Sequence, residues 1–354
     1  MRADASPRTT LTLQEPRGDF RGTWDRFVAH FPGATFCHRA GWHRLLEEVL
    51  AAEPRYRVAV GPDGEWRGVL PLFRVRSFLF GHYLVSVPFL SYGGPIGETE
   101  AVSLLARDAA REARPTGADL LELRCRKAPD PVPLPLTLRE RKVAVILDLP
   151  GDPDELFRER LRSKVRSQIR RPLKEGMEAR FGFDQVGPFL EVFRRTMRDL
   201  GTPVLPARLF RELPDLFRDE VTFGAVWFRD RPVAAGCGFA FGGEFEMTWA
   251  GALRDHQRLA PNMLLYWAFM ERAVERGLRR FNFGRSTPGS GPHRFKTQWG
   301  GRDEPLPWLQ WSRRGLASTP NPDAGRYRRA VRAWQRMPLN VANRVGPYLA
   351  RRIP

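Results

Sequence analysis

The sequence predicts an α/β (α+β) protein with two domains of similar plan, each a mixed, mostly antiparallel sheet flanked by helices. The first observation is length, because 354 residues suffice for two hydrophobic cores. The second is composition, since 42% hydrophobic and 11% aromatic residues are typical of a folded protein. The third is a repeated order of periodic segments, namely hairpin, strand, helix and strand, which occurs once in each half. We therefore expect a duplicated domain.

The first half of the chain contains one copy of this order. Apolar residues at helical spacing predict helices within 20–52, and Gly61-Pro62-Asp63-Gly64 predicts the turn of a β-hairpin. A stretch with four prolines follows the first copy and predicts a linker, because proline disfavours both helices and central strands. The expected parts are hairpin strands 56–60 and 68–75, a helix over 99–114, a strand over 118–124, a first domain over 10–127 and a linker over 128–142.

The second half repeats the order. Its clearest element is an amphipathic helix that starts at Pro261 and stops at Gly277, which fits the preference for proline at the start and glycine at the end of helices. The other expected parts are a strand over 143–149, helices near 154–175 and 185–200, hairpin strands 221–228 and 233–241, a strand over 244–251 and a strand at Phe281. We place the second domain over 143–311 and a basic tail over 312–354.

The net charge of +18 predicts attraction to an anionic partner. Charge alone fits a phosphorylated substrate, an anionic membrane face or RNA, although the basic residues lack the interleaved aromatic platform of single-strand binders. The tail from Ser312 holds ten arginines and one acid, Asp323, with Tyr327, Val331 and Trp334 near helical spacing. We expect either a basic helix packed on the body or a segment in peripheral contact with anionic lipid.

The cysteines and the first residues indicate a compartment. Cys37, Cys125 and Cys237 are far apart and odd in number, which argues against a disulfide framework and fits a reducing cytosol. The histidines and cysteines show no metal-ligand spacing, so we expect no bound metal. The first residues lack the apolar core of a signal peptide, and the hydrophobic window 77–97 is interrupted by glycine and proline. We expect a cytoplasmic protein, or one peripheral to the inner face of the cytoplasmic membrane.

A basic helix is predicted over 158–171, with Leu161, Val165 and Ile169 as its apolar stripe. So many like charges on one helix repel each other, which favours an anionic ligand that balances them. Arginine suits phosphate or pyrophosphate because its planar fork forms two parallel hydrogen bonds. The alternative is a solvated basic face. The candidate substrate-binding residues here are Lys164, Arg166, Arg170 and Arg171.

The stretch from Leu278 to Gly301 is the strongest candidate for chemistry. A strand that ends at Gly284 leads into a loop rich in Gly, Pro and Ser, and Lys296, one of five lysines, follows it. A lysine cation can stabilise developing oxyanion charge. No Ser-His-Asp order or GxSxG motif accompanies it, which favours direct acyl transfer over an acyl-enzyme. The alternative is a strand, a surface loop and a second strand anchored by Trp299.

Three other residues could accept a proton from an attacking amine, although each is also an ordinary core or loop residue: His293, Tyr92 and Glu246. The start of the 262–276 helix follows a strand, so its backbone N–H groups, including that of Asn262, could face a bound anion. Acetyltransferases of the GNAT type hold the coenzyme A pyrophosphate at such a point with a glycine-rich turn. Here Ala260 and Pro261 occupy that turn, which argues against tight coenzyme A binding in the usual mode.

Six motifs occur in an order that resembles a known family. They are Tyr92-Gly93-Gly94-Pro95, the SKxRxxIRR segment over 163–171, FRRTMRDLGT over 193–202, PNxLL over 261–265, Phe281-Asn282-Phe283-Gly284-Arg285-Ser286 and FKxxWG over 295–300. Together they resemble the FemAB group of peptidoglycan-bridge aminoacyltransferases, and most closely the branch found with exosortase and extracellular-polysaccharide systems. This branch is also similar to the BioF2-like acetyltransferase domain. The resemblance covers roughly residues 20–311.

The resemblance implies two tandem GNAT-like acyltransferase domains, without a permanently bound cofactor, that transfer an aminoacyl or acyl group to an amine. The donor it implies is aminoacyl-tRNA or acyl-CoA. It places Phe295 and Lys296 at the catalytic centre, with His293 in the same segment, and it makes Tyr92, Arg285 and Asn262 candidates for substrate binding. The chain departs from the bridge-forming enzymes by lacking their helical arm and by its basic tail. The alternatives are an acetyl-CoA-dependent N-acetyltransferase and a non-catalytic accessory protein of exopolysaccharide or exosortase systems.

Overall fold

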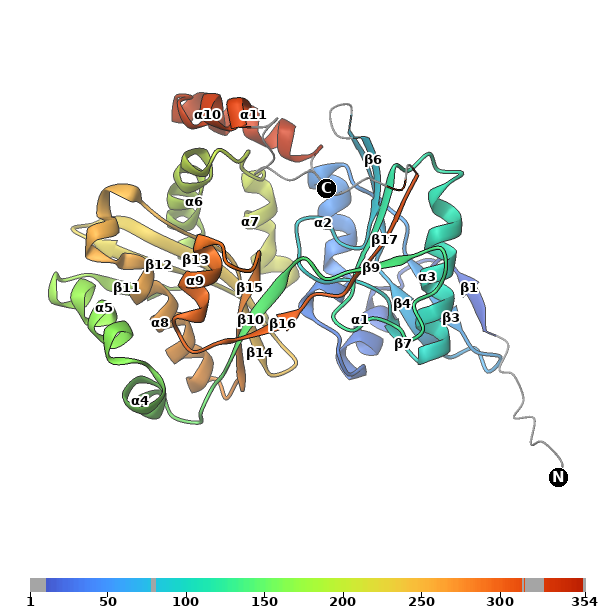
Figure 1. Cartoon of the computed structure of the whole chain (residues 1–354), viewed down its shortest axis with the longest axis horizontal. Helices are drawn as coiled ribbons and strands as arrows, with labels where there is room; N and C mark the ends of the chain where they lie inside the picture. Colours follow the sequence, from blue (N-terminus) through green and yellow to red (C-terminus); the bar gives the residue numbers. More distant parts are fainter. Residues whose placement is uncertain (1–10, 78–80, 314, 316–327, 353–354) are drawn as a thin grey trace. The chain divides into compact units, whose positions relative to one another are not determined.

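The computed structural model describes residues 11–77, 81–313, 315 and 328–352, which form two compact units. Unit 1 contains the described parts of 1–140 and 307–319, and unit 2 those of 141–306 and 320–353 (Figure 1). Both units combine sheets with flanking helices, so the predicted α/β class is confirmed.

Unit 1 has two sheets and a small set of helices. The first sheet has the order β1 (Thr12–Gln14), β3 (Arg57–Val60), β4 (Trp66–Leu70), β7 (Ile96–Gly97). The second has the order β2 (Glu53–Pro54), β5 (Phe73–Ser77), β6 (Gly81–Val85), β8 (Leu120–Arg124), β17 (Trp308–Ser312), β9 (Thr137–Arg139). The helices are α1 (Arg21–His30), the 3₁₀ turn Phe36–His38, α2 (Gly41–Leu50) and α3 (Thr99–Ala113). Small residues on α3, such as Ala106 and Ala109, let it pack closely into the core.

The predicted strand 68–75 is wrong as a single strand. The chain leaves the first sheet after Leu70 and enters the second at Phe73, so β4 and β5 belong to different sheets. Pro71 lies at the break, and proline has no N–H group to continue a strand ladder. The predicted turn at 61–64 does join β3 to β4, with the Gly64 N–H donating to the Gly61 carbonyl at 3.0 Å.

Unit 2 is built on one sheet, with the order β11 (Glu178–Phe181), β12 (Val221–Phe228), β13 (Arg231–Phe241), β14 (Glu244–Ala252), β15 (Arg280–Ser286), β10 (Val143–Asp148), β16 (Arg302–Pro305). One face packs on α8 through Phe245 and Phe269, and the opposite face packs on α6 through Phe223 and Phe189. The helices are α4 (Pro153–Glu155), the π-helical turn Leu156–Arg160, α5 (Ser163–Lys174), the 3₁₀ turn Phe183–Gln185, α6 (Val186–Leu200), α7 (Ala207–Leu216), the 3₁₀ turn Arg254–Leu259, α8 (Pro261–Glu275), α9 (Gly291–Thr297), α10 (Arg328–Gln335) and α11 (Leu339–Ala350).

The two units share one motif, a pair of parallel strands joined through a helix. In unit 1 this motif is β6, α3 and β8, with Tyr83 in register with Leu120. In unit 2 it is β14, α8 and β15, with Glu244 in register with Arg280. Parallel strands need such a crossover connection, and here each crossover is a helix. The duplicated plan expected from the periodicity is therefore present.

The strand that follows each motif in the sequence pairs in the sheet of the other unit. After β8 comes β10, which lies between β15 and β16 in unit 2. After β15 comes β17, which lies between β8 and β9 in unit 1. The units therefore differ from the predicted ranges, because 308–312 belongs to unit 1. The predicted linker also contains structure, since Leu136 is buried and β9 pairs with β17.

The described part of the tail packs on unit 2. The Arg198 guanidinium donates to the Met337 carbonyl at 3.0 Å, and the Gln335 amide donates to the Asp199 carbonyl at 3.1 Å. Val331 lies against Gly201, just beyond α6. A packed basic helix was one of the two expectations for this segment, while Tyr327 lies outside the described residues. None of the helices in the described part of the chain has both the length and the apolar character to cross a membrane.

Candidate active site

The two parallel strands of unit 2 pair at one end only. Their register runs from Glu244 opposite Arg280 to Glu246 opposite Asn282, and beyond that point β15 pairs with β10. Gly284 lies just past this point with a φ of +73°, a conformation that glycine adopts without steric cost. The β10–β15 register shifts at the same place, between Ala144 and Ile146. The bulge opens a gap between the two strands, which we call the strand split.

Lys296 lies at the strand split. Its ammonium donates to the carbonyl oxygens of Gly284 at 3.0 Å and Arg285 at 2.9 Å. Burial lowers the pKa of Lys296 to about 8, because an ammonium loses hydration in the interior. The Glu246 carboxylate opposes this pKa shift and the Arg285 charge adds to it. The side chain is therefore a cation near neutral pH that gives up its proton more readily than an exposed lysine.

A buried polar cluster lies on the paired end of the two strands. The Asn282 side-chain amide donates to Glu244 Oε1 at 2.9 Å and lies 3.5 Å from Glu246 Oε2. The Asn282 side-chain carbonyl accepts from the Gly284 N–H at 2.8 Å. Glu246 is only 3% exposed, so its charge is screened little by water. Asn282 thus links both carboxylates to the glycine whose carbonyl holds Lys296.

Sequence reasoning weighed Glu246 as a base but missed Glu244 and Asn282 as its partners. The signal was present, because acids at i and i+2 of a strand point to the same face. Two acids on one face of a buried strand require a compensating group. Arg280 supplies part of it, with its guanidinium 3.2 Å from Glu244 Oε2.

The FKxxWG segment is helical, so the strand–loop–strand alternative is wrong. The Ser290 hydroxyl accepts from the His293 N–H at 3.3 Å and caps α9, whose first turn contains Pro292. Phe295 packs edge-on against Tyr266 at 5.0 Å, and Trp299 is buried beneath them. These rings fix α9 on α8 and so position Lys296. The structure gives Phe295 a packing contact next to the site.

His293 connects the start of α9 to β16. Its Nε2 lies 2.9 Å from an Asp303 carboxylate oxygen, and its Nδ1 accepts from the Gly289 N–H at 3.1 Å. The ring therefore carries its proton on Nε2. Both nitrogens are engaged in holding the loop before α9, so a positioning role fits the geometry of His293 better than proton transfer.

The start of α8 does not resemble a glycine-lined anion site. Ala260, at a φ of +55°, precedes Pro261, which contributes no N–H group. The Met263 N–H already donates to the Ala260 carbonyl at 2.9 Å. Asn262 is half-buried in the first turn. Few backbone donors are left at this point for a pyrophosphate.

The predicted basic helix 158–171 is two helices in the structure. The backbone is extended at Leu161 and Arg162, between the π-helical turn and α5. The Arg166 guanidinium donates to the carbonyls of Arg158 at 2.9 Å and Leu161 at 2.6 Å, which holds the break. The helix also continues past Pro172 to Lys174 rather than ending at the proline. The apolar stripe of Val165 and Ile169 is buried as expected, as is Leu161.

The cations on α5 differ in their contacts. Arg166 is half-buried in the bonds just described, and the Arg170 guanidinium lies 5.1 Å from the centre of the Phe157 ring. Lys164, Arg170 and Arg171 are exposed on the same helix. In the preceding turn, Arg158 and Arg160 form ion pairs with Asp154 and Glu155. The cations of α5, rather than those of the preceding turn, therefore form the anion-attracting surface.

Tyr92 lies in the core of unit 1, whereas the other predicted site residues belong to unit 2. It is 1% exposed, and the Arg126 guanidinium covers its ring at 5.4 Å. Gly94, two residues on, packs directly against Cys125. The Tyr-Gly-Gly-Pro motif therefore shapes a buried turn of unit 1, and a substrate-binding or basic role for Tyr92 has no support in its surroundings.

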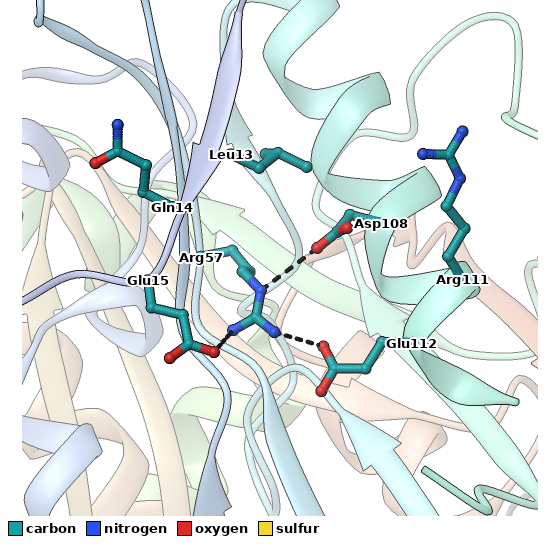
Figure 2. Close-up of a pocket in the computed structure, with 7 residues that line it drawn as sticks. All are labelled: Leu13, Gln14, Glu15, Arg57, Asp108, Arg111 and Glu112. Carbon is teal, nitrogen blue, oxygen red and sulfur yellow. Dashed lines mark hydrogen bonds and ion pairs between the residues drawn. The ribbon is translucent and has the colours of Figure 1, made fainter. Parts of the chain in front are cut away.

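Unit 1 has a polar hollow of its own, a cavity of about 330 Å³ beside α3 (Figure 2). Arg57 lies at its centre, with its guanidinium 2.9 Å from Glu15, 3.4 Å from Asp108 and 2.9 Å from Glu112. Burial raises the pKa of Glu112, while the charges of Arg57 and Arg55 oppose that shift. The cluster ties β3 to α3, and we interpret it as structural. In the described residues, no group of three or more His, Cys, Asp and Glu side chains could hold a metal ion.

Comparison with known proteins agrees with this geometry. Residues 159–297 match a family model described as an acetyltransferase (GNAT) domain, a range that contains the strand split and Lys296. No curated protein matches the sequence.

Three solved structures are similar to the whole chain. FemX has a TM-score of 0.64 at 15% identity, over 85% of this chain and 97% of that chain. The C-terminal domain of a putative lysylphosphatidylglycerol synthetase from Agrobacterium fabrum has a TM-score of 0.54 at 15% identity, over 76% and 87%. A tandem GNAT protein from the clavulanic acid biosynthesis pathway has a TM-score of 0.52 at 12% identity, over 86% and 98%. These likenesses show the shared tandem fold, and the chain belongs to the GNAT acyltransferases in their FemAB/BioF2-like form.

Proposed function

We propose that this acyltransferase is an N-acyltransferase of the FemAB type, acting on an amine of a cell-envelope or polysaccharide-related acceptor. The observation that carries the proposal is the ammonium of Lys296 at the strand split, with the buried Glu246 carboxylate close enough to influence its pKa. A fixed cation and a buried base at the edge of one sheet are the two groups that aminolysis of an ester or thioester requires.

The chemistry is a direct transfer. The acceptor amine attacks the acyl carbon, and a new C–N bond forms while the carbonyl oxygen becomes an oxyanion that the Lys296 ammonium stabilises. The amine proton passes to the Glu246 carboxylate. The C–O or C–S bond to the donor then breaks, and the leaving oxygen or sulfur takes up a proton. Cys237 is buried in unit 2 with a raised thiol pKa, so it is not the activated thiolate of an acyl-enzyme.

The start of α8 favours aminoacyl-tRNA over acyl-CoA as the donor. The family model's name favours the alternative, an acetyl-CoA-dependent N-acetyltransferase. Since Ala260 and Pro261 replace the glycine-rich turn, we expect titration calorimetry with acetyl-CoA to give no resolvable heat. The double variant Ala260→Gly/Pro261→Gly restores a backbone donor, and glycine fits the left-handed conformation of Ala260. Tight binding of acetyl-CoA by the unaltered chain would favour the acetyltransferase alternative.

The exposed cations of α5 support a phosphorylated substrate. Reversing Lys164, Arg170 and Arg171 to glutamate is expected to raise KM about tenfold or more with kcat little changed, because the helix attracts the substrate without touching the reacting atoms. Steady-state kinetics at two salt concentrations measures this, and high salt should reduce the difference.

The matched control for that variant is the reversal of Arg26, Arg107 and Arg111, which are exposed on helices of unit 1. It changes the net charge equally, so an equal rise in KM would mean that α5 has no special role. An unchanged KM in the α5 variant would mean that this helix is a solvated face.

The proposed location is the cytoplasm, where charged tRNA is available as a donor. The three cysteines are free and buried, which is compatible with a reducing compartment. Mass spectrometry of co-purifying molecules tests donor and compartment together, since it distinguishes tRNA from coenzyme A and from nucleotide-linked sugars.

A further inference from the structure

The outer face of α11 carries large apolar side chains. Val341 is 42% exposed, Val345 37% and Tyr348 66%, and their spacing of four and three residues puts them on one side of the helix. The described chain has eight exposed large apolar side chains, and these are three of them. A fourth, Leu200 at 58%, ends α6, the helix on which α10 and α11 pack. Exposed apolar groups are thus concentrated on this part of unit 2.

The inner face of the same helix is made of small residues. Ala342, Gly346 and Ala350 are buried at intervals of four, and a Cβ atom at Gly346 would meet the Val204 backbone nitrogen at 3.1 Å. A helix that only needed to cover the body would bury its valines and expose its alanines. Here the close approach of the small face fixes the helix in place and leaves the larger side chains outside.

Positive charge surrounds this apolar face. No acidic residue occurs after Asp323, so nothing in the sequence of either helix offsets its arginines. The Arg351 guanidinium lies 5.9 Å from the centre of the Tyr348 ring, so cation and aromatic ring occupy the same surface. The exposed arginines of the two helices and the residues after them are Arg329, Arg332, Arg336, Arg344, Arg351 and Arg352.

We propose that the face of Val341, Val345 and Tyr348, with its surrounding arginines, docks on the surface of an anionic lipid bilayer. Shallow apolar side chains ringed by cations without acids match a layer of anionic headgroups above acyl chains. Each arginine near such a surface contributes about 1 kcal/mol, and each buried apolar group adds to it. A tyrosine beside arginine suits the headgroup level.

This surface goes beyond the proposed function, because it concerns where the enzyme acts and involves none of the groups at the strand split. The helix is 12 residues long, so it lies along the bilayer and does not cross about 30 Å of hydrocarbon. An RNA or an acidic protein would also be attracted by the arginines, but neither would need the exposed valines.

The test is co-sedimentation of the full chain with vesicles of phosphatidylcholine alone or of equal parts phosphatidylcholine and phosphatidylglycerol. Binding is expected only to the anionic vesicles and should weaken with salt. The variant Val341→Ser/Val345→Ser/Tyr348→Ser should reduce the bound fraction about tenfold. Its thermal melting should be unchanged, since the three side chains lie outside the core. A second variant, Arg344→Gln/Arg351→Gln/Arg352→Gln, should weaken binding similarly.

Controls separate this surface from general stickiness. Leu134 and Leu138 are exposed apolar residues of unit 1 at 86% and 40%, and their replacement by serine should leave vesicle binding unchanged. Undiminished binding of the valine–tyrosine variant would overturn the proposal, as would binding to tRNA that needs only the arginines in the absence of any vesicle binding. Turnover with a water-soluble acceptor should be the same in all these variants, so loss of docking and loss of the proposed activity are distinguishable.

Discussion

Replacing Lys296 by methionine is expected to lower kcat by about 10²–10³-fold, the usual cost of losing one oxyanion donor. Methionine keeps the length and apolar stem of lysine but removes the ammonium that bonds to the carbonyls of Gly284 and Arg285. Single-turnover kinetics with a labelled donor measures the chemical step directly. Retained turnover in this variant would remove Lys296 from the mechanism.

The fold should survive the same change. Burial lowers the pKa of Lys296 to about 8, so at neutral pH the folded chain holds a cation that would rather be hydrated. This destabilisation is present below about pH 8 and is relieved as pH rises toward the unfolded value of 10.5, because the unfolded state then binds more protons. We expect Lys296→Met to melt no lower than the parent chain at neutral pH, as measured by calorimetry.

The pH dependence of transfer separates the charged form of Lys296 from the neutral one. If the ammonium stabilises the oxyanion, kcat should fall as pH rises through about 8. Lys296→Arg keeps a cation at every accessible pH, so any activity it retains should lack this alkaline limb. A rate that increases through the same range in the parent chain but not in the arginine variant would instead assign Lys296 the role of a base.

Replacing Trp299 by alanine is expected to destabilise unit 2 by about 3–5 kcal/mol, the range for deleting a buried aromatic ring. Trp299 is 1% exposed and lies 6.2 Å from Phe283 and 6.4 Å from both Tyr266 and Phe295, measured between ring centres. The cavity would lie directly beneath α9, so Lys296 should lose its fixed position together with the stability. Urea unfolding followed by circular dichroism measures the loss.

Trp299→Phe is the matched control. The indole Nε1 of Trp299 is buried without a hydrogen-bond partner, so its removal leaves no other group unsatisfied. A phenyl ring keeps most of the packing, and the cost should be closer to about 1 kcal/mol. If both substitutions cost the same, the ring is not the support of α9 and the destabilisation has another origin.

The repeated plan of the fold could be predicted because its signals are local. The helix from Pro261 and the hairpin across Arg229-Asp230-Arg231-Pro232 follow from spacing and turn residues within a few positions of each other. The start of α9 was also legible, since Ser290 before Pro292 is a helix-start pattern. It was overlooked because the surrounding glycines favour a loop.

The site itself could be predicted only in part. Lys296 was found through its rarity and its motif, but its place at the strand split depends on the bulge at Gly284 and on α9. Asn282 reaches Glu244 across a distance of 38 residues in sequence, and no local pattern specifies such a partner. Tyr92 was mistaken for a site residue because a motif does not show whether its aromatic ring is buried.

The reciprocal placement of β10 and β17 has a consequence for biosynthesis. The sheet of unit 1 places β17 between β8 and β9, so its edge beside β8 stays open until residues 308–312 have left the ribosome. Unit 2 receives β10 early and can close its sheet as soon as β16 emerges. The amino-terminal half of the chain therefore completes its fold after the carboxy-terminal half, which reverses the usual vectorial order of co-translational folding. Until then the nascent chain exposes an unpaired strand edge, a species on which chaperones act.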